Sequence, residues 1–517
     1  MSYGELSNTQ ETMVLPMLQM KNIRGKPYIT VSAKGMVNGL SNIPNDGADF
    51  GPDTTEGATA PGQYGGTYTE TVGIQEAFTY LESSGGEIRL ADGIFYLSTG
   101  ATYTSGAPLR ISGIRPNFMR GVTFTSQMSK GTLIMPASDY PTNNMPLFKF
   151  LNTAAGNNYG FVDIGNMGII GTYIEVGDTV PNGASSTSPV ALQFGNTTST
   201  DGGGPVAKNV HDMKIDNCVS AIVSYSGGGP NFYGNLHTDG CGYAGTVTIN
   251  GSTYSNPQTF ILNDLSSHWG RIEVFSPGGH DAFAINNGAG GYAPTVLIDN
   301  LYTTSPDYGV FNFLTTLTGV YLAIGVMYLS GNANNGVPIF ELPASGSLTA
   351  YIANLYQNGN ALVRQYNSSS TARVDIAVAN YHATNSAQIV SSGNSVASGS
   401  RLAISNAYLE SLYSSALTES ITGLTWTMAH IYPTQVPTTP SVPTSATAQE
   451  NTNSYAVDVY VYGGDVTEIQ ITKGGTAYTV FSVSTAIAMS GQAYKLNPGD
   501  SITVTYSTAP TWEWLSD

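Results

Sequence analysis

The feature that most constrains the fold is a short phrase that recurs between residues 160 and 410. Each copy has a β-rich run, then Asn or Gly, then an apolar or aromatic residue and a polar turn. The copies begin at Ile215, Ile298, Ile324, Ile352, Val378 and Ile404. Repeats of roughly 20 to 50 residues built from short β runs are typical of solenoids, whose stacked coils bury one another's apolar faces. The repeat therefore predicts a parallel β-helix.

Asn recurs at one position of this phrase. The last three copies are evenly spaced, since 380 − 354 and 406 − 380 are both 26. Asn tolerates the left-handed backbone angles of a turn and can hydrogen-bond to its equivalent in the next coil. Coincidence in an Asn-rich chain is the alternative, but apolar and Tyr positions recur in phase with the Asn. We expect one line formed by Asn217, Asn300, Asn354, Asn380 and Asn406.

Composition agrees with an all-β protein and limits its partners. Charged residues make up only 10% of the chain, and 41% are hydrophobic, which supports a core. The net charge of −17 argues against a nucleic-acid partner, which needs a basic surface. No stretch approaches 18 consecutive apolar residues, so we expect no membrane insertion. Residues 1–21 lack a basic region followed by an apolar one, so we expect no secretory signal peptide.

The two cysteines, Cys218 and Cys241, share a D-x-C pattern with Asp216 and Asp239. If the spacing of this pattern corresponds to one coil, the sulfurs lie about 5 Å apart in adjacent coils. A disulfide is geometrically possible at that spacing. We favour two buried thiols, because a free Cys behaves as a small core hydrophobe.

The N-terminal third predicts a cap on the solenoid. Residues 1–70 are rich in Gly, Thr and Asn and are expected to form an irregular attachment arm. Apolar residues at 74, 77, 78 and 81 have helical spacing, and the Gly pair at 85 and 86 ends that helix. Strands are expected at 87–90 and 94–97. An amphipathic helix is a common cover for the unpaired edge at the end of a β-helix. We therefore assign residues 71–425 to the β-helix together with its N-terminal cap.

This order of helix, Gly pair, strand and D-G turn resembles the opening of the pectate-lyase-like right-handed parallel β-helix superfamily, which includes many phage tailspikes. The counterparts are Asp46-Gly47-Ala48-Asp49, Gly73-Ile74-Gln75-Glu76-Ala77, Gly85-Gly86-Glu87-Ile88 and Asp92-Gly93-Ile94-Phe95-Tyr96. The resemblance implies a right-handed solenoid of about ten coils, and spikes of this class are usually parallel homotrimers.

The C-terminal part predicts a separate small module. Residues 426–445 form a Pro/Thr-rich linker, and residues 446–517 contain strand-like runs at 457–462, 467–471 and 502–506, with a turn expected at Gly463-Gly464. These runs fit an antiparallel β-sandwich. The module also contains the stretches Asn451-Thr452-Asn453, Leu496-Asn497-Pro498-Gly499-Asp500-Ser501-Ile502 and Ala509-Pro510-Thr511-Trp512. Through them, residues 443–517 resemble a β-sandwich module at the ends of phage structural and tail proteins. A generic carbohydrate-binding or immunoglobulin-like module is the alternative.

Polar residues that could carry chemistry gather between residues 211 and 281. Asp216, Asp239 and Asp264 are separated by about one coil each, which would stack them on one face. The candidate catalytic residues are Asp239, Asp264, His268 and Arg271. The candidate glycan-binding residues are His237, Glu273, His280 and Asp281. The candidate metal ligands are Asp216 and Asp239, because stacked carboxylates call for a cation such as Ca²⁺ or a shared proton.

The same residues admit several chemistries. A carboxylate pair suits a glycosidase, and an Arg beside Ca²⁺ suits a lyase that acts next to a uronate carboxylate. The alternative is that each Asp caps a turn. Polygalacturonase-like enzymes show N-x-D, D-D, G-H-G and R-x-K in order, and this chain offers only Gly279-His280-Asp281 and Arg271-Ile272-Glu273.

The sequence thus leaves two functions. The first is a virion spike or tail protein that recognises cell-surface glycans, assembles with other virion proteins and acts outside cells without a signal peptide. The second is a polysaccharide-degrading lyase or glycoside hydrolase with a β-helix catalytic domain. The C-terminal module, the expected lack of a signal peptide and the incomplete catalytic motifs favour the first.

Overall fold

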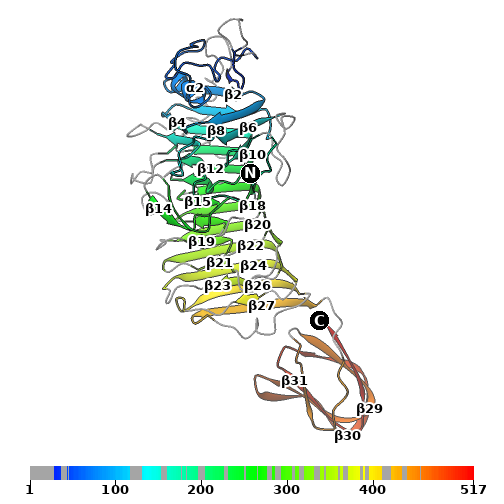
Figure 1. Ribbon diagram of the computed structural model, residues 1–517. Helices are drawn as coiled ribbons and strands as arrows, with labels where there is room; N and C mark the ends of the chain where they lie inside the picture. The colour runs from blue at the N-terminus through cyan, green and yellow to red at the C-terminus, as the bar shows by residue number, and fades with distance from the viewer. Residues whose placement is uncertain are drawn as a thin grey trace, which may run out of the picture.

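The structure is a computed structural model, and a defined part of the chain is described below. This part comprises residues 28–36, 44, 46–116, 131–152, 160–175, 177–181, 183–195, 204–205, 207–225, 231–249, 252–264, 266–275, 282–285, 293–304, 309–313, 319–330, 338–342, 345–358, 361–364, 371–384, 388–390, 395–409, 421–433, 439–453 and 456–516. Short strands stack along one axis, with the antiparallel C-terminal module beyond the last coil (Figure 1).

Within the described residues, the larger sheet has fifteen strands, all joined by parallel pairing. Its main path runs through β1 (Ile29–Val31), β2 (Gly86–Leu90), β5 (Leu109–Ser112), β8 (Phe161–Ile170), β10 (Ala207–Asp216), β12 (Asn231–Asp239), β16 (Ser266–Phe275), β18 (Thr295–Thr304), β20 (Val320–Ser330), β22 (Ser347–Asn358), β24 (Arg373–Thr384), β26 (Ser400–Leu409) and β27 (Leu424–Pro433). Two further strands, β3 (Gly93–Leu97) and β6 (Thr132–Pro136), join it at the N-terminal end.

A second parallel sheet has ten shorter strands. Its members in chain order are β4 (Ala101–Thr104), β7 (Phe148–Leu151), β9 (Val190–Phe194), β11 (Ser220–Ser224), β15 (Phe260–Leu262), β17 (Phe283–Ile285), β19 (Phe311–Phe313), β21 (Pro338–Glu341), β23 (Ala361–Arg364) and β25 (Gln388–Val390). Each coil from β10 onward to β25 contributes one strand to each sheet. The predicted parallel β-helix is therefore confirmed.

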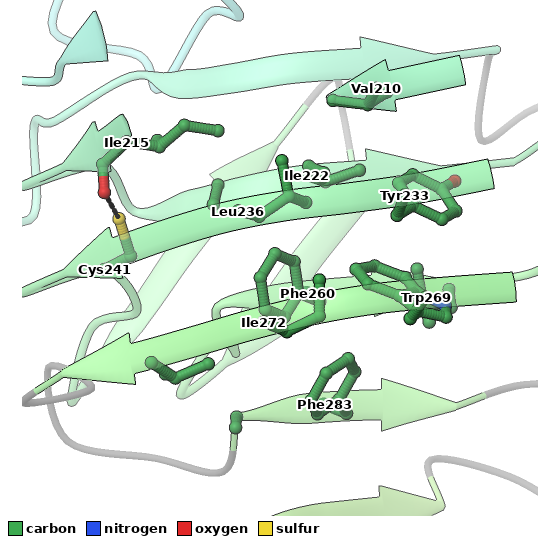
Figure 2. Packing of buried hydrophobic residues seen from close by; sticks show 14 of the residues in the cluster. Val210, Ile215, Ile222, Tyr233, Leu236, Cys241, Phe260, Trp269, Ile272 and Phe283 are labelled. Carbon is green, nitrogen blue, oxygen red and sulfur yellow. Dashed lines mark hydrogen bonds between the residues drawn. The ribbon is translucent and has the colours of Figure 1, made fainter. Parts of the chain in front are cut away.

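The inward side chains form a continuous core along the solenoid. In the long strands, apolar residues alternate with outward polar ones, as in β18, where Val296, Ile298 and Leu301 are buried. Aromatic rings stack from coil to coil inside, and Figure 2 shows Tyr233 beside Trp269, with ring centroids 4.0 Å apart. Coil-to-coil stacking of like side chains is how a solenoid buries faces that no single repeat can bury alone.

The predicted Asn line is confirmed over four positions. Strand pairing aligns Asn300 with Val326, and Val326 with Asn354, Asn380 and Asn406 in turn. The Asn380 amide donates to Asn354 Oδ1, and the Asn406 amide donates to Asn380 Oδ1, each over 3.1 Å. The line lies at a bend within the long strands, where two successive residues face outward, and not at a turn between strands.

Asn217 lies outside this line, contrary to the prediction. It follows the end of β10, where it has a positive φ and bonds Gly183 and Pro181. The corresponding bend in β10 is at Asp212, next to Met213, which pairs with Leu236. Asn217 was misplaced because its phrase matches the repeat by composition while the strand register is five residues earlier.

The predicted cap is present at the N-terminal end. Helix α2 (Ile74–Leu81) buries Ile74, Ala77, Phe78 and Leu81. The Phe78 ring packs against Tyr103 and against the aromatic residues of β7. The helix thus covers the apolar interior of the first coils, as its spacing predicted.

The two cysteines are free thiols in the core, as favoured from the sequence. Their coils are adjacent, because Asp216 pairs with Asp239. The Cys241 thiol donates to the Ile215 carbonyl over 3.4 Å (Figure 2). Burial raises the pKa of the Cys218 thiol well above its ordinary value, so this thiol stays protonated.

The C-terminal module is a five-stranded antiparallel sheet folded around its own core. Its strands are β28 (Ala448–Glu450), β29 (Val457–Lys473), β30 (Thr476–Leu496), β31 (Ser501–Thr508) and β32 (Thr511–Ser516). The expected turn at Gly463-Gly464 is wrong, because β29 continues through both residues with shifts of register. Two successive positive φ angles form a bulge here, and a hairpin turn uses the same angles, so composition does not separate them.

The predicted domain boundaries at 70, 425 and 445 stay predictions. Within the first range, β1 pairs with β2 and so belongs to the large sheet. Across the second boundary, β27 pairs with β26 and extends to Pro433. Among the described residues, no helix is long and apolar enough to cross a membrane.

Candidate functional site

Asp264 faces the interior of the solenoid. Its carboxylate accepts hydrogen bonds from Lys208 Nζ at 3.0 Å, the Tyr233 hydroxyl at 2.9 Å and the Ser224 hydroxyl at 2.5 Å. The side chain of Lys208 is 0% exposed and that of Asp264 is 2% exposed. Burial lowers the pKa of Lys208, and the Asp264 carboxylate opposes this effect. This predicted catalytic residue therefore belongs to a buried ion pair and cannot reach a glycan on the outer surface.

Asp216 and Asp239 are in register and buried, but Phe275, not Asp264, occupies the next position of their line. The coil after β12 is longer than its neighbours because it carries a hairpin, β13 (Thr246–Ile249) and β14 (Ser252–Ser255). Across the described ranges, no group of three or more His, Cys, Asp or Glu side chains could hold a metal ion. The role of Asp216 and Asp239 as metal ligands stays a prediction.

The outward side chains of β8 to β26 form a surface that we call the long-strand face. Near its middle, Glu273 bonds His237 Nδ1 at 2.8 Å through one oxygen and the Arg271 guanidinium through the other. Burial raises the pKa of Glu273, but the hydrogen bonds from His237 and Arg271 outweigh it and hold this pKa below its ordinary value. Three of the sequence-predicted residues thus meet in one hydrogen-bonded cluster.

His268 lies on the same face, at the start of β16. Its Nε2 atom is 3.0 Å from Asp299 Oδ1 on the neighbouring strand. The exposed Phe232 ring lies beside it, with centroids 6.1 Å apart. The other two predicted residues, His280 and Asp281, lie outside the described residues.

A second charged cluster, which the sequence did not single out, lies toward the N-terminal end of the face. His211 bridges two carboxylates, with 3.0 Å from Nε2 to Asp163 and 2.8 Å from Nδ1 to Asp212. Hydrogen bonding to Asp163 raises the pKa of His211, burial opposes this, and Asp212 adds to the rise. Outward alternation along β10 could have indicated His211 and Asp212, but Asp163 is contributed by a distant part of the sequence.

Toward the C-terminal end the face becomes aromatic. Strand pairing places one residue from each of five coils in a single file, namely Tyr302, Tyr328, Tyr356, His382 and Tyr408. Successive ring centroids lie 5.1, 6.0, 4.5 and 4.5 Å apart. Because the rings cover one another's faces, the file presents ring edges to solvent, and Tyr328 is 44% exposed.

The charged and aromatic parts belong to one line of the sheet. Lys214 pairs with His237, His237 with Glu273, and Glu273 with Tyr302, which begins the aromatic file. The Asn line runs parallel to this file, because each aromatic residue follows an Asn by two positions in β18, β22, β24 and β26. The long-strand face therefore pairs an amide with a ring edge in the coils of β18, β22, β24 and β26, while β20 has Val326 in place of the Asn.

Comparison with known proteins adds little to this geometry. No family model matches the chain, and no curated protein matches it. Among solved structures, the chain is similar to the crystal structure of the enzymatically active domain of bacteriophage CBA120 tailspike protein 4. The TM-score is 0.32 with 10% sequence identity, covering 98% of this chain and 80% of that chain. The fold assignment above rests on the strand pairing itself.

Proposed function

We propose that the protein is a virion spike or tail protein that binds a cell-surface polysaccharide along the long-strand face. The observation that carries this proposal is the continuous line from Lys214 through Glu273 to the aromatic file. Parallel coils repeat their side chains about every 4.8 Å, so a polymer of repeating units lying along the axis meets similar groups again and again. The assignment to a virion is supported by the sequence resemblances of residues 46–96 and 443–517 to phage proteins.

The chemistry of the face suits sugars. Tyr combines an apolar ring edge with a hydroxyl, and Asn amides donate and accept hydrogen bonds, so both match sugar CH and OH groups. Arg271, in the cluster around Glu273, has a side chain that is 69% exposed and supplies hydrogen-bond donors for polar substituents of a sugar. Strongly charged surfaces are rare in a chain with only 10% charged residues, so this clustering supports a binding role.

Three carboxyl groups of this face support binding rather than hydrolysis. A glycosidase needs one carboxylic acid whose pKa is raised so that it can donate a proton. Burial acts in that direction on Asp212, Glu273 and Asp375, but hydrogen bonds from neighbouring side chains outweigh it and lower all three pKa values. These groups are therefore carboxylates at neutral pH.

The test is binding of the full-length protein to a panel of bacterial surface polysaccharides. We expect at least one to bind, and Tyr328→Ala and Arg271→Gln to weaken it about tenfold each, as for central contact residues. Tyr68→Ala is the matched control, because Tyr68 is exposed outside both the long-strand face and the C-terminal module.

Two outcomes would contradict the proposal. One is that no polysaccharide of the panel binds, and the other is that both long-strand variants bind like the wild type. Reducing ends or unsaturated uronates are measured in parallel. Their release by the wild type, lost in Glu273→Gln, would favour the enzyme instead.

A further inference from the structure

A cavity of about 600 Å³ lies on the other sheet, away from the long-strand face. Thr102 of β4 and Lys149 of β7 lie at its base, where strand pairing aligns them side by side. The turn at 142–146 and the hairpin strand β13, at 246–248, form its walls. Its volume is in the range of small-ligand sites.

The walls of this cavity are held by hydrogen bonds and by apolar packing. Asn144, at a positive φ, donates to the carbonyls of Ser186 at 2.9 Å and Ser188 at 2.7 Å, which holds the turn in place. The hairpin packs Val247 and Ile249 in a separate apolar cluster over the short-strand sheet. A site held by packing and buried hydrogen bonds needs little reorganisation when a ligand binds.

The lining has the composition of a site for an anionic, hydroxyl-rich ligand. Lys149 is the charged member of the described lining, and the polar remainder consists of Thr, Ser and Asn side chains. Met145, Pro146 and Val247 add apolar surface. Lys149 is about half buried, and burial lowers its pKa, so its ammonium group gains from a nearby anion.

We propose that this cavity binds an acidic sugar residue. The Lys149 ammonium pairs with the sugar carboxylate, the Thr and Asn groups bond its hydroxyls, and the apolar wall packs against its CH groups. This inference rests on the proposed function for its ligand class, but it concerns a second site with a separate test.

The probes are glucuronate, galacturonate and N-acetylneuraminate, each against its neutral counterpart, measured by ligand-observed NMR and titration with the full chain. We expect at least one acid to bind and the neutral sugars not to, with affinity falling as salt rises. Lys149→Gln should weaken binding about tenfold or more, which corresponds to losing one charge-assisted contact. Thr248→Tyr should also weaken it by filling the cavity from the exposed hairpin strand.

Lys495→Gln is the matched control, because it makes the same charge change at an exposed site of the C-terminal module. The inference is overturned if no acid binds, or if Lys149→Gln binds the acids like the wild type. The two proposals fail separately. The cavity proposal alone is refuted if no acid binds, while polysaccharide binding is lost in Tyr328→Ala and kept in Lys149→Gln. The proposed function alone is refuted if the acids bind in a way that depends on Lys149 and no polysaccharide binds.

Discussion

Inside the solenoid, Lys208 and Asp264 form an ion pair in which both charged groups are buried. Both groups are withdrawn from water, and the carboxylate relies on Lys208, Tyr233 and Ser224. Such pairs add little net stability relative to apolar residues, but losing one partner leaves a buried charge behind.

We therefore expect Lys208→Met to lower the free energy of unfolding by about 3–5 kcal/mol. The double variant Lys208→Met/Asp264→Leu should recover most of that loss, because it removes the isolated carboxylate as well. Denaturant unfolding of the three proteins measures both effects. Equal destabilisation in the single and double variants would show that the charge itself is not the cause.

A second residue-scale prediction concerns pH. The pKa of His211 is raised between Asp163 and Asp212, so its stabilising contribution is complete below the unfolded pKa of about 6.5 and is lost as pH rises through the folded pKa. The stability difference between wild type and His211→Gln should therefore be largest in acid and shrink toward alkaline pH. Thermal unfolding across pH 5 to about 9 measures it.

His382 provides the control of opposite sign. Burial between Tyr356 and Tyr408 lowers its pKa, so its contribution is present above the unfolded pKa and is lost as pH falls through the folded one. The difference between wild type and His382→Gln should grow with pH. The same trend in both variants would contradict these assignments.

At the scale of elements, the Asn line joins three consecutive long strands. Asn380 donates to Asn354 and accepts from Asn406, and its amide also donates to the Ala353 carbonyl, so Asn380→Ala removes three side-chain hydrogen bonds at once. We expect a loss of about 1–2 kcal/mol, measured by denaturant unfolding.

Val326 interrupts the same line between Asn300 and Asn354. Val326→Asn should join the two parts and raise stability, and it serves as the matched gain-of-contact variant. If Asn380→Ala leaves the free energy of unfolding unchanged and Val326→Asn lowers it, the Asn line does not stabilise the fold.

The sequence predicts elements where the coils are regular and fails where they are not. Even spacing of Asn354, Asn380 and Asn406 corresponds to actual strand register. The sequence predicts Asp264 on the line of Asp239, but the hairpin β13–β14 lengthens that coil and places Phe275 there instead. The periodicity of the sequence does not indicate such an insertion.

The same limit applies to the site. His237 and Glu273 meet because β12 pairs with β16, and Arg271 joins them two positions before Glu273, while their functional roles stay predictions. Whether a residue such as Asp264 faces inward or outward depends on register, and Asp163 joins His211 only through the pairing of β8 with β10.

At the scale of the whole molecule, the prediction is assembly. Spikes of the resembled class are usually parallel homotrimers, so we expect three copies of this chain to assemble. Light scattering at micromolar concentration and neutral pH should give three times the mass of one chain. A monomer under these conditions would contradict the prediction.

The uniform step of the C-terminal coils has a consequence for how such a protein changes in evolution. Equivalent positions on the Asn line are 26 residues apart in two successive coils, and each coil places an aromatic residue two positions after its Asn. In-frame duplication or loss of one 26-residue unit keeps every inward and outward position in phase. The reach of the molecule can then change by about 4.8 Å per unit, without redesign of its core or of its ends.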